Sequence, residues 1–521
     1  MVIQDLRFKI LVYMGYRIYG VKKRERVWCY FKKNSVICNA FSYKLLLGLT
    51  LRKKYTFENR KKKNIQTMKY HFIAIGGSAM HNLAIALHLK GATVTGSDDE
   101  IFDPAKSRLE KYGLLPSSIG WNADLVNDSI DAIILGMHAR EDNPELLKAK
   151  ELGIKIYSYP EFLYEQSKDK TRVVVGGSHG KTTITSMIIH VLHQCGVDCD
   201  YMVGAQLEGF EVMVRLTEEA KVMIIEGDEY LTSPIDRRPK FHLYQPDIGI
   251  ISGIAWDHIN VFPTFDIYVE QFKIFADMIP ASGSFIYCED DPILKEMAEK
   301  VAHSHSLPYG VHPYCIENGV THLKTNTKEY SIKVFGKHNL SNLNAARLAC
   351  LALGISEDDF YCAISSFKGA SKRLELIAEN EQCAIFKDFA HSPSKLKATI
   401  EAVKEQFPDR KLVAFMELHT FSSLTESFLS EYNGSMFQAD IPIIYFNAEA
   451  VAHKKLPPLT SEKIFSYFGQ KNIEIFNDSN SLIDRILLLK KEPIVLLFMS
   501  SGNFNGVNLN ILANKILLLQ S

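Results

Sequence analysis

The chain has 521 residues, of which 46% are hydrophobic, so it is long enough for about three globular domains with substantial cores. Its 60 basic and 60 acidic residues cancel overall, but 17 Lys and Arg against only 3 Asp and Glu fall within residues 1–67. The remainder is therefore acidic, which disfavours general nucleic-acid binding and suits a cytoplasmic enzyme. Nine cysteines without a CxxC spacing predict free thiols in a reducing compartment.

The basic segment at residues 1–67 has two interpretations. Its longest apolar run, AFSYKLLLGL at 40–49, contains Lys44 and is far shorter than the ~18 residues that a membrane-spanning helix needs. A membrane-surface or RNA-binding arm is one interpretation. We favour the other, that the segment is not a native domain but sequence translated from a start upstream of Met68, which stands directly before the first clear strand.

The first predicted unit has a strand, the glycine pair Gly76 and Gly77, a helix, and a second strand that ends at Ser97 and Asp98. Asp98 lies 21 positions after the glycine pair, the distance at which a Rossmann-like unit places a carboxylate beside a ribose. The glycines depart from GxGxxG. NAD binding and a plain strand–helix turn without a ligand are therefore kept as alternatives.

The stretch VVVGGSHGKTTITSMIIHVL at 173–192 predicts a buried strand, a glycine loop and a helix. Backbone N–H groups in such a loop turn toward phosphate oxygens, and the helix start adds its positive dipole end. Lys181 would reach the terminal phosphates of a nucleotide, and the Thr182 hydroxyl would bind Mg2+. The loop is shorter than a strict GxxxxGK[ST] pattern, so a purely structural turn is the alternative.

Two later strands end in candidate metal ligands. One runs into Glu226, and a carboxylate at the carboxyl end of a buried strand beside a phosphate loop is where Mg2+ needs a protein ligand. The next ends at Asp257 and His258. A histidine at a strand end is more often a packing or capping residue, so its position alone leaves the role of His258 open.

Six motifs in order resemble the ATP-dependent Mur ligases of bacterial peptidoglycan synthesis. They are GSHGKTT at 177–183, EGDEY at 226–230, WDH at 256–258, GKHNLSNLNAA at 336–346, KRLE at 372–375 and DFAHSP at 388–393. The resemblance covers residues 68 to about 510. It implies three consecutive α/β domains: a Rossmann-like N-terminal domain, a P-loop ATPase-like central domain and a Rossmann-like C-terminal domain.

The resemblance also implies what each domain binds. We expect UDP-N-acetylmuramate binding at 68–170, ATP binding at 171–376 and amine-substrate binding at 377–521. Active sites of this kind lie between domains, so domain closure is expected.

Individual roles follow from the same resemblance. The ATP contacts would come from Gly177, Ser178, His179, Gly180, Lys181, Thr182, Thr183, Asn339, Asn342, Arg373 and Asp388. The other substrates would be held by Gly76, Gly77, Ser78, Met80, Ser97, Asp98 and His391. Mg2+ would be held by Thr182, Glu226 and His258, and the catalytic residues would be Lys181, Glu226 and His258.

In this family the lactyl carboxylate of UDP-N-acetylmuramate attacks the γ-phosphate of ATP, and an amine then displaces phosphate from the acyl phosphate. Because anion meets anion, the reaction needs Lys181 and Mg2+ to neutralise and position the groups. Several members also use a carbamylated lysine between two metals. Lys273 lies 15 residues after His258, near that offset, but the branch that this chain resembles generally lacks that lysine, and an ordinary helical lysine is favoured.

The motifs leave two candidates for the amine substrate. The loop HFIAIGGSAM and the later EDNPEL are similar to the UDP-N-acetylmuramate-binding branch, while EGDEYLTSPIDRRPKFHLYQPD, DHINVFP and VLLFMSSGNFNGV are similar to its murein-recycling members. Those members add the tripeptide L-alanyl-γ-D-glutamyl-meso-diaminopimelate; the alternative is the branch that adds L-alanine in de novo synthesis. His391-Ser392-Pro393 and the loop at 416–424 depart from the close relatives, in the domain expected to select the amine.

Two other classes of function are distinguishable from this one. A folylpolyglutamate-synthetase-like enzyme would share the ATP core but would not need a uridine-binding domain. A P-loop binding module would bind nucleotide without ligation. We expect a cytoplasmic bacterial enzyme with ATP and Mg2+, with no nucleic-acid partner and no membrane span.

Overall fold

The computed structural model describes residues 67–521 apart from 205–209, 257–260, 301–304, 327, 370–372, 490 and 521, and describes three strands before them. The chain divides into two compact units, Met1–Thr67 and Met68–Ser521. In the first, the backbone forms an antiparallel sheet of β1 (Ile18–Lys23), β2 (Arg26–Phe31) and β3 (Val36–Asn39). Apart from these three strands, residues 1–66 lie outside the described residues, and so does the prediction about the origin of this segment.

The second unit begins with a parallel sheet in the order β5-β4-β6-β7. Its strands and helices are β4 (Lys69–Ile73), α3 (Ser78–Leu89), β5 (Thr93–Ser97), α4 (Ala105–Lys111), η1 (Ala123–Leu125), β6 (Ala132–Leu135), α5 (Pro144–Glu151), β7 (Lys155–Ser158) and α6 (Tyr159–Ser167). All four residues of β6 are buried, as expected where helices cover both faces of a parallel sheet. The α6 start is fixed by a reciprocal capping box between Ser158 and Glu161.

The central sheet has the order β10-β9-β11-β8-β12-β13-β14, parallel except for β10. Its strands are β8 (Thr171–Gly176), β9 (Cys199–Met202), β10 (Val214–Arg215), β11 (Val222–Glu226), β12 (Ile248–Ile251), β13 (Ser284–Cys288) and β14 (Ser306–Tyr309). Its helices are α7 (Lys181–Gln194), α8 (Lys240–Leu243), α9 (Phe265–Asp277), α10 (Pro292–Lys300), α11 (Lys337–Ala352) and α12 (Glu357–Ile364). Val174 of β8 packs with α9, whereas Val173 and Val175 pack with α7, so the helices cover both faces.

A small antiparallel sheet follows, made of β15 (Tyr314–Glu317), β16 (Val320–Lys324) and β17 (Glu329–Ile332). The ring of Tyr330 on β17 stacks on Tyr361 of α12 at 5.0 Å. This contact attaches the small sheet to the core of the central domain.

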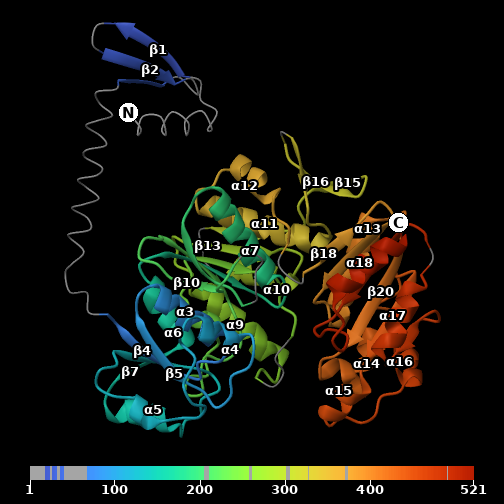
Figure 1. Ribbon diagram of the computed structural model, residues 1–521, viewed down its shortest axis with the longest axis horizontal. Helices are drawn as coiled ribbons and strands as arrows, with labels where there is room; N and C mark the ends of the chain where they lie inside the picture. Colours follow the sequence, from blue (N-terminus) through green and yellow to red (C-terminus); the bar gives the residue numbers. More distant parts are fainter. Residues whose placement is uncertain are drawn as a thin grey trace. The chain divides into compact units, whose positions relative to one another are not determined.

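The C-terminal sheet has the order β18-β19-β23-β20-β21-β22, parallel except for β18 (Figure 1). Its strands are β18 (Glu375–Glu379), β19 (Cys383–Asp388), β20 (Lys411–Leu418), β21 (Ile441–Phe446), β22 (Glu474–Phe476) and β23 (Ile494–Met499). Its helices are α13 (Pro393–Gln406), η2 (Ser422–Leu424), α14 (Glu426–Leu429), η3 (Ser430–Tyr432), α15 (Ala448–His453), α16 (Ser461–Phe468), α17 (Ser479–Leu487) and α18 (Leu509–Gln520). The predicted fold class, three consecutive α/β domains, is confirmed. The exact bounds of the three domains stay a prediction. The expected boundary after residue 376 falls within β18, and this strand lies wholly in the third sheet.

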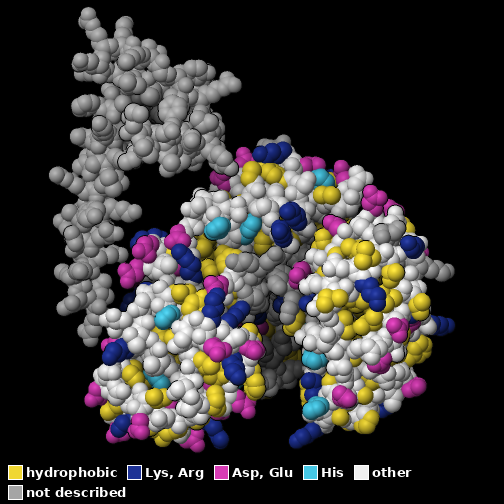
Figure 2. Space-filling view, in the orientation of Figure 1, with side chains coloured by type: hydrophobic (Ala, Val, Ile, Leu, Met, Phe, Trp, Pro, Cys, Tyr) yellow, Lys and Arg dark blue, Asp and Glu magenta, His cyan; other side chains and the backbone are white. Residues whose placement is uncertain are grey.

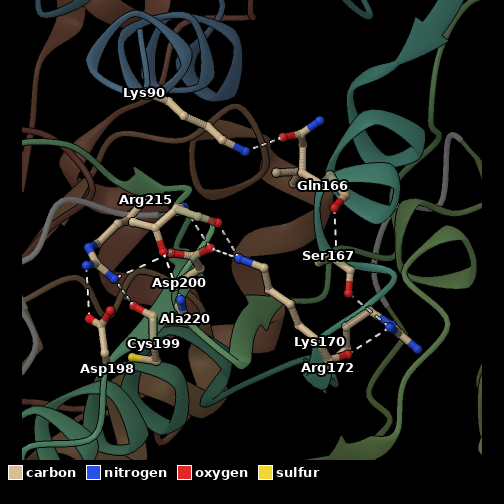
Figure 3. A network of polar contacts seen from close by, with 12 residues as sticks. Lys90, Gln166, Ser167, Lys170, Arg172, Asp198, Cys199, Asp200, Arg215 and Ala220 are labelled. Carbon is tan, nitrogen blue, oxygen red and sulfur yellow. Dashed lines mark hydrogen bonds and ion pairs between the residues drawn. The ribbon is translucent and has the colours of Figure 1, made fainter. Parts of the chain in front are cut away.

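A buried polar network fixes the connection between the first and second sheets (Figure 3). The Arg172 guanidinium donates to the carbonyls of Ser167, Lys168 and Lys170 at 2.9–3.1 Å, which satisfies acceptors at the end of α6. Lys170 pairs with Asp200 of β9, which is fully buried. The guanidinium of Arg172 therefore holds three backbone carbonyls of the linker that joins the two sheets.

On the face of Met68–Ser521 seen in Figure 2, acidic and basic side chains are interspersed and do not form a single basic patch. Of the helices in the described part of the chain, none has both the length and the apolar character needed to cross a bilayer.

Candidate functional site

The loop between β8 and α7 requires glycine at two positions. Gly177 has φ +119° and Gly180 has φ +81°, in the left-handed region that favours glycine. A Cβ on Gly180 would lie 2.3 Å from Oδ1 of Asn342 on α11, and one on Gly177 would lie 2.3 Å from Oγ of Ser252 after β12. The turn is therefore shaped by neighbours that come from two other elements.

Lys181, the first residue of α7, is held inside this loop. Its Nζ donates to the Gly177 carbonyl and to Glu229 Oε2, each at 2.7 Å. Burial acts to lower the pKa of Lys181, but the carboxylates of Glu229, Asp228 and Glu226 outweigh it and raise that pKa. The lysine is therefore charged, and the sequence reasoning missed Glu229, although it quoted the EGDEY motif that contains this residue.

Thr182 and Glu226 lie together at the same edge of the sheet. The Thr182 hydroxyl donates to Glu226 Oε1 at 2.8 Å, and the Gly204 N–H donates to Oε2 at 2.8 Å. Burial raises the pKa of Glu226, although these two hydrogen bonds and the charges of Lys181 and Arg373 act to lower it. A hydroxyl and a carboxylate form an oxygen donor set that suits a hard cation such as Mg2+. His258, the third predicted ligand, lies outside the described residues.

The two asparagines expected near adenine have different surroundings. Asn342 contacts the phosphate loop through Gly180, as described above. Asn339 is 5% exposed, and its Nδ2 donates to the Phe335 carbonyl one turn earlier at 2.9 Å. Of the remaining loop residues, Thr183 is buried in α7 and His179 is exposed.

Arg373 and Asp388 come together where the central and C-terminal domains meet. Asp388 accepts hydrogen bonds from the Leu374 N–H at 3.0 Å and from the Thr399 hydroxyl at 2.7 Å. The Arg373 guanidinium lies 5.0 Å from the ring centroid of Phe389, and its charge acts on Glu226. His391 follows on the same loop, where its Nδ1 is hydrogen-bonded to the Phe389 carbonyl at 2.8 Å.

The first glycine loop closes on a carboxylate. The Gly76 N–H donates to Asp98 Oδ2 at 2.7 Å, so the glycine pair and the acidic residue at the end of β5 meet as the sequence indicated. Burial raises the pKa of Asp98 to about 6, although the Gly76 N–H acts to lower it. Ser78 begins α3 and is exposed, whereas Met80 is buried beneath the loop.

Ser97 has a different environment from the one expected of a substrate contact. Its hydroxyl donates to Glu145 of α5, which also accepts the Asn122 N–H at 2.8 Å and contacts Nε2 of His71 at 3.2 Å. Ser97, Glu145 and His71 are all buried. The Ser97 side chain thus belongs to an internal network that the sequence did not predict, and its substrate role stays a prediction.

Lys273 lies on α9 with its side chain 50% exposed, and its Nζ pairs with Glu270 at 3.3 Å. A lysine in this exposed position has the surroundings of an ordinary helical surface residue.

Three consecutive parts of the chain match known domain families. Residues 69–171 match "Mur ligase family, catalytic domain", residues 175–350 match "Mur ligase middle domain", and residues 372–502 match "Mur ligase, glutamate ligase domain". The chain is also 31% identical over 432 residues to a UDP-N-acetylmuramate–L-alanine ligase of Caldicellulosiruptor bescii, an alignment that covers 79% of this chain and 90% of that protein.

Two solved structures are similar. The UDP-N-acetylmuramate:L-alanyl-gamma-D-glutamyl-meso-diaminopimelate ligase from Neisseria meningitides has 25% identity and a TM-score of 0.53, covering 58% of this chain and 98% of that one. The UDP-N-acetylmuramate-alanine ligase from Thermotoga maritima has 20% identity and a TM-score of 0.62, covering 87% of this chain and 98% of that one, which shows a shared fold.

The order of the three matched domains agrees with the order of the three large sheets. The alignment with the Caldicellulosiruptor bescii ligase covers most of both chains. The chain therefore belongs to the Mur ligase family, the ATP-dependent ligases that form amide bonds in peptidoglycan synthesis.

Proposed function

We propose that this protein joins the lactyl carboxylate of UDP-N-acetylmuramate to the amino group of L-alanine, at the expense of ATP and in the cytoplasm. The observation that carries the reaction class is the charged Lys181 beside the Thr182–Glu226 pair, at the carboxyl edge of a parallel sheet. Ligands of open α/β sheets bind at this edge.

In the proposed reaction, a carboxylate oxygen attacks the γ-phosphorus of ATP, and the bond from phosphorus to the ADP oxygen breaks. The amine then attacks the acyl carbon, and phosphate leaves. Both steps bring negative groups together, so the Lys181 ammonium is assigned to the terminal phosphates, where a fixed charge in a buried site is worth far more than in water. The Gly177 and Gly180 loop supplies the backbone geometry around them.

Mg2+ would be held by Thr182 and Glu226, with His258 as the expected further ligand. When bound, the cation would neutralise charge on the phosphate oxygens. We assign Asn339, Asn342, Arg373 and Asp388 to ATP. The last two residues lie at the junction with the C-terminal domain, so their contacts would depend on how that domain closes.

We assign Gly76, Gly77, Ser78, Met80, Ser97 and Asp98 to UDP-N-acetylmuramate. Within this group, the Asp98 carboxylate beside the Gly76 N–H is the acceptor that suits a ribose hydroxyl. His391 is assigned to the amine side of the site because it follows Asp388 at the end of β19.

Two observations bear on the amine. Curated relatives named as L-alanine ligases align over 90% to 99% of their own length, which supports L-alanine. The tripeptide L-alanyl-γ-D-glutamyl-meso-diaminopimelate is the second candidate, because the Neisseria meningitides ligase for this peptide is 25% identical in sequence. The sequence motifs alone favoured the tripeptide, whereas the curated relatives favour L-alanine.

The test is ADP release by the purified full-length chain with ATP, Mg2+ and UDP-N-acetylmuramate, comparing L-alanine with the tripeptide over a range of concentrations. We expect kcat/KM for L-alanine to exceed that for the tripeptide by at least ~100-fold, since buried polar groups commonly discriminate to this extent. The reverse preference would assign the protein to murein recycling and leave the reaction class intact. No ADP release with either amine would contradict the ligase proposal.

A further inference from the structure

The ammonium of Lys181 is held from two sides before any nucleotide binds. Gly177 and Glu229 accept two of its N–H bonds, each at 2.7 Å. An ammonium has three donors. Two protein acceptors therefore restrict a long, flexible side chain to a narrow range of positions and leave the third donor for a phosphate oxygen.

Glu229 is held in turn by α9. Its Oε1 accepts a hydrogen bond from the hydroxyl of Tyr268 at 3.1 Å, and both residues are almost completely buried. The Tyr268 ring packs at 5.1 Å from Phe272 and at 5.3 Å from Phe262, centroid to centroid. The tyrosine hydroxyl is therefore fixed by an aromatic core and not by a mobile surface side chain.

The same hydroxyl reaches the phosphate loop. It lies 3.2 Å from Oγ of Ser178, and that oxygen also contacts the backbone of Ala255, donating to its carbonyl and accepting its N–H at 2.8 Å each. Ala255 follows β12 in the sequence. The tyrosine thus bonds the segment after β11 and packs against the phosphate loop at Ser178, and Ser178 in turn bonds the segment after β12.

We propose that Glu229 and Tyr268 are positioning residues that hold Lys181 and Ser178 in the conformation that receives the triphosphate of ATP. The inference rests on the proposed function for the identity of the nucleotide. It goes further because it assigns an effect on nucleotide affinity to Glu229 and Tyr268, neither of which is expected to contact the nucleotide. Tyr268 lies on α9, outside the six motifs that resemble the Mur ligases.

The physical reason is that the arrangement lowers the cost of ordering on binding. A lysine loses rotamer entropy when it is fixed, and here much of that loss precedes nucleotide binding. A buried carboxylate without a cation is costly, so Glu229 keeps the ammonium close even when the site holds no phosphate. A purely structural pair would instead change thermal stability without changing the affinity of the folded protein for ATP.

The experiment compares Tyr268→Phe and Glu229→Gln with the wild-type full-length chain. The main measurement is the equilibrium dissociation constant for ATP with Mg2+ by calorimetry, which needs no turnover. KM for ATP and for UDP-N-acetylmuramate and the melting temperature are measured on the same preparations. Tyr361→Phe is the matched control. Tyr361 lies on α12 of the same domain, and the substitution removes a buried hydroxyl that is hydrogen-bonded to His312 Nε2 at 2.9 Å.

We expect Tyr268→Phe to weaken ATP binding about fivefold, because it removes one hydrogen bond from a neutral hydroxyl. We expect Glu229→Gln to weaken ATP binding at least tenfold, because it removes the charge that pairs with the Lys181 ammonium. KM for UDP-N-acetylmuramate should change less than twofold, and the control should bind ATP as the wild type does. Unchanged or tighter ATP binding in a folded Tyr268→Phe variant would overturn the inference, and tighter binding in Glu229→Gln would mean that Glu229 competes with phosphate. If the wild type binds ATP but ligates neither amine, the proposed function fails while the ATP comparison still decides the inference.

Discussion

Two glycine loops in this molecule have the same local design and opposite polarity. Each follows a buried parallel strand and leads into a helix, from β4 to α3 and from β8 to α7. In the first, the Gly76 N–H already bonds the Asp98 carboxylate. In the second, the ammonium of Lys181 bonds back to the Gly177 carbonyl. One loop presents an acceptor, and the other presents a cation.

The difference shows that the strand–turn–helix pattern sets the shape of both sites, whereas a different element supplies the charge of each: a carboxylate after the neighbouring strand β5 in the first, and the ammonium of Lys181 at the start of α7 in the second. Beside the first loop, Asp98 directly follows the last residue of β5. Beside the second, β11 ends in Glu226 and brings Glu229 after it. An acceptor suits sugar hydroxyls and a cation suits phosphates, so under the proposed function a single fold motif would serve two substrates.

Lys181→Ala should give the largest effect. Removing the ammonium that we assign to the terminal phosphates should lower kcat by at least ~100-fold, as removal of single electrostatic stabilisers does elsewhere. Calorimetric affinity for UDP-N-acetylmuramate should stay within twofold, because that substrate is assigned to the other loop. A variant that retains more than a tenth of wild-type turnover would contradict the assigned role.

Glu226→Gln should raise the Mg2+ concentration that gives half-maximal rate by about tenfold, because a neutral amide is a weaker ligand for a hard cation. The matched control is Glu329→Gln, at an exposed glutamate on β17. Mg2+ titrations of ADP release decide the matter. Identical Mg2+ dependence in the two variants would remove Glu226 from the metal site.

Gly180→Ala and Gly77→Ala compare the two loops directly. Gly180 has φ +81° and no room beside Asn342, so alanine should cost at least about 1 kcal/mol in free energy of unfolding. Gly77 has φ −55° and its nearest neighbouring atom would be 3.4 Å from a Cβ, so alanine should change stability by less than ~0.5 kcal/mol. Urea unfolding measures both. Equal destabilisation would show that the two loops have the same steric requirement.

Asp98 should make the first loop sensitive to pH. Because burial raises its pKa to about 6, the carboxyl group of Asp98 is protonated below that pH and is a weaker acceptor for a ribose hydroxyl. KM for UDP-N-acetylmuramate should therefore fall a few-fold as pH rises through 6, and Asp98→Asn should show no such step.

The sign of the stability effect follows from the same shift. The folded pKa is above the ordinary value of 3.8, so the contribution of Asp98 to stability is present at low pH and declines as pH rises through about 6. The melting temperature of Asp98→Asn relative to wild type should accordingly increase from pH 4 to pH 7. A constant difference would contradict the raised pKa.

The resemblance of its motifs to the Mur ligases implied the three α/β domains, and the sequence by itself determined the phosphate loop with Lys181 and Thr182 and the strand that ends in Glu226. These features are local: glycine spacing, apolar periodicity and a charged residue at a strand end are all visible within a few tens of residues. The pairing of Gly76 with Asp98 was also predictable, because adjacent parallel strands bring their carboxyl ends together.

Only the tertiary structure decided which side chains turn toward the loops. Glu229 lies 48 positions from Lys181 and accepts its hydrogen bond, and Tyr268, 87 positions from Lys181, bonds Glu229 in turn. These contacts form because the segments after β8 and β11 and the helix α9 converge at one sheet edge. Ser97 turned the other way, since Glu145 of α5 offers its hydroxyl a buried acceptor. Whether groups from distant elements form a hydrogen bond depends on differences of a few tenths of an ångström in their separation. No spacing along the chain encodes differences of this size.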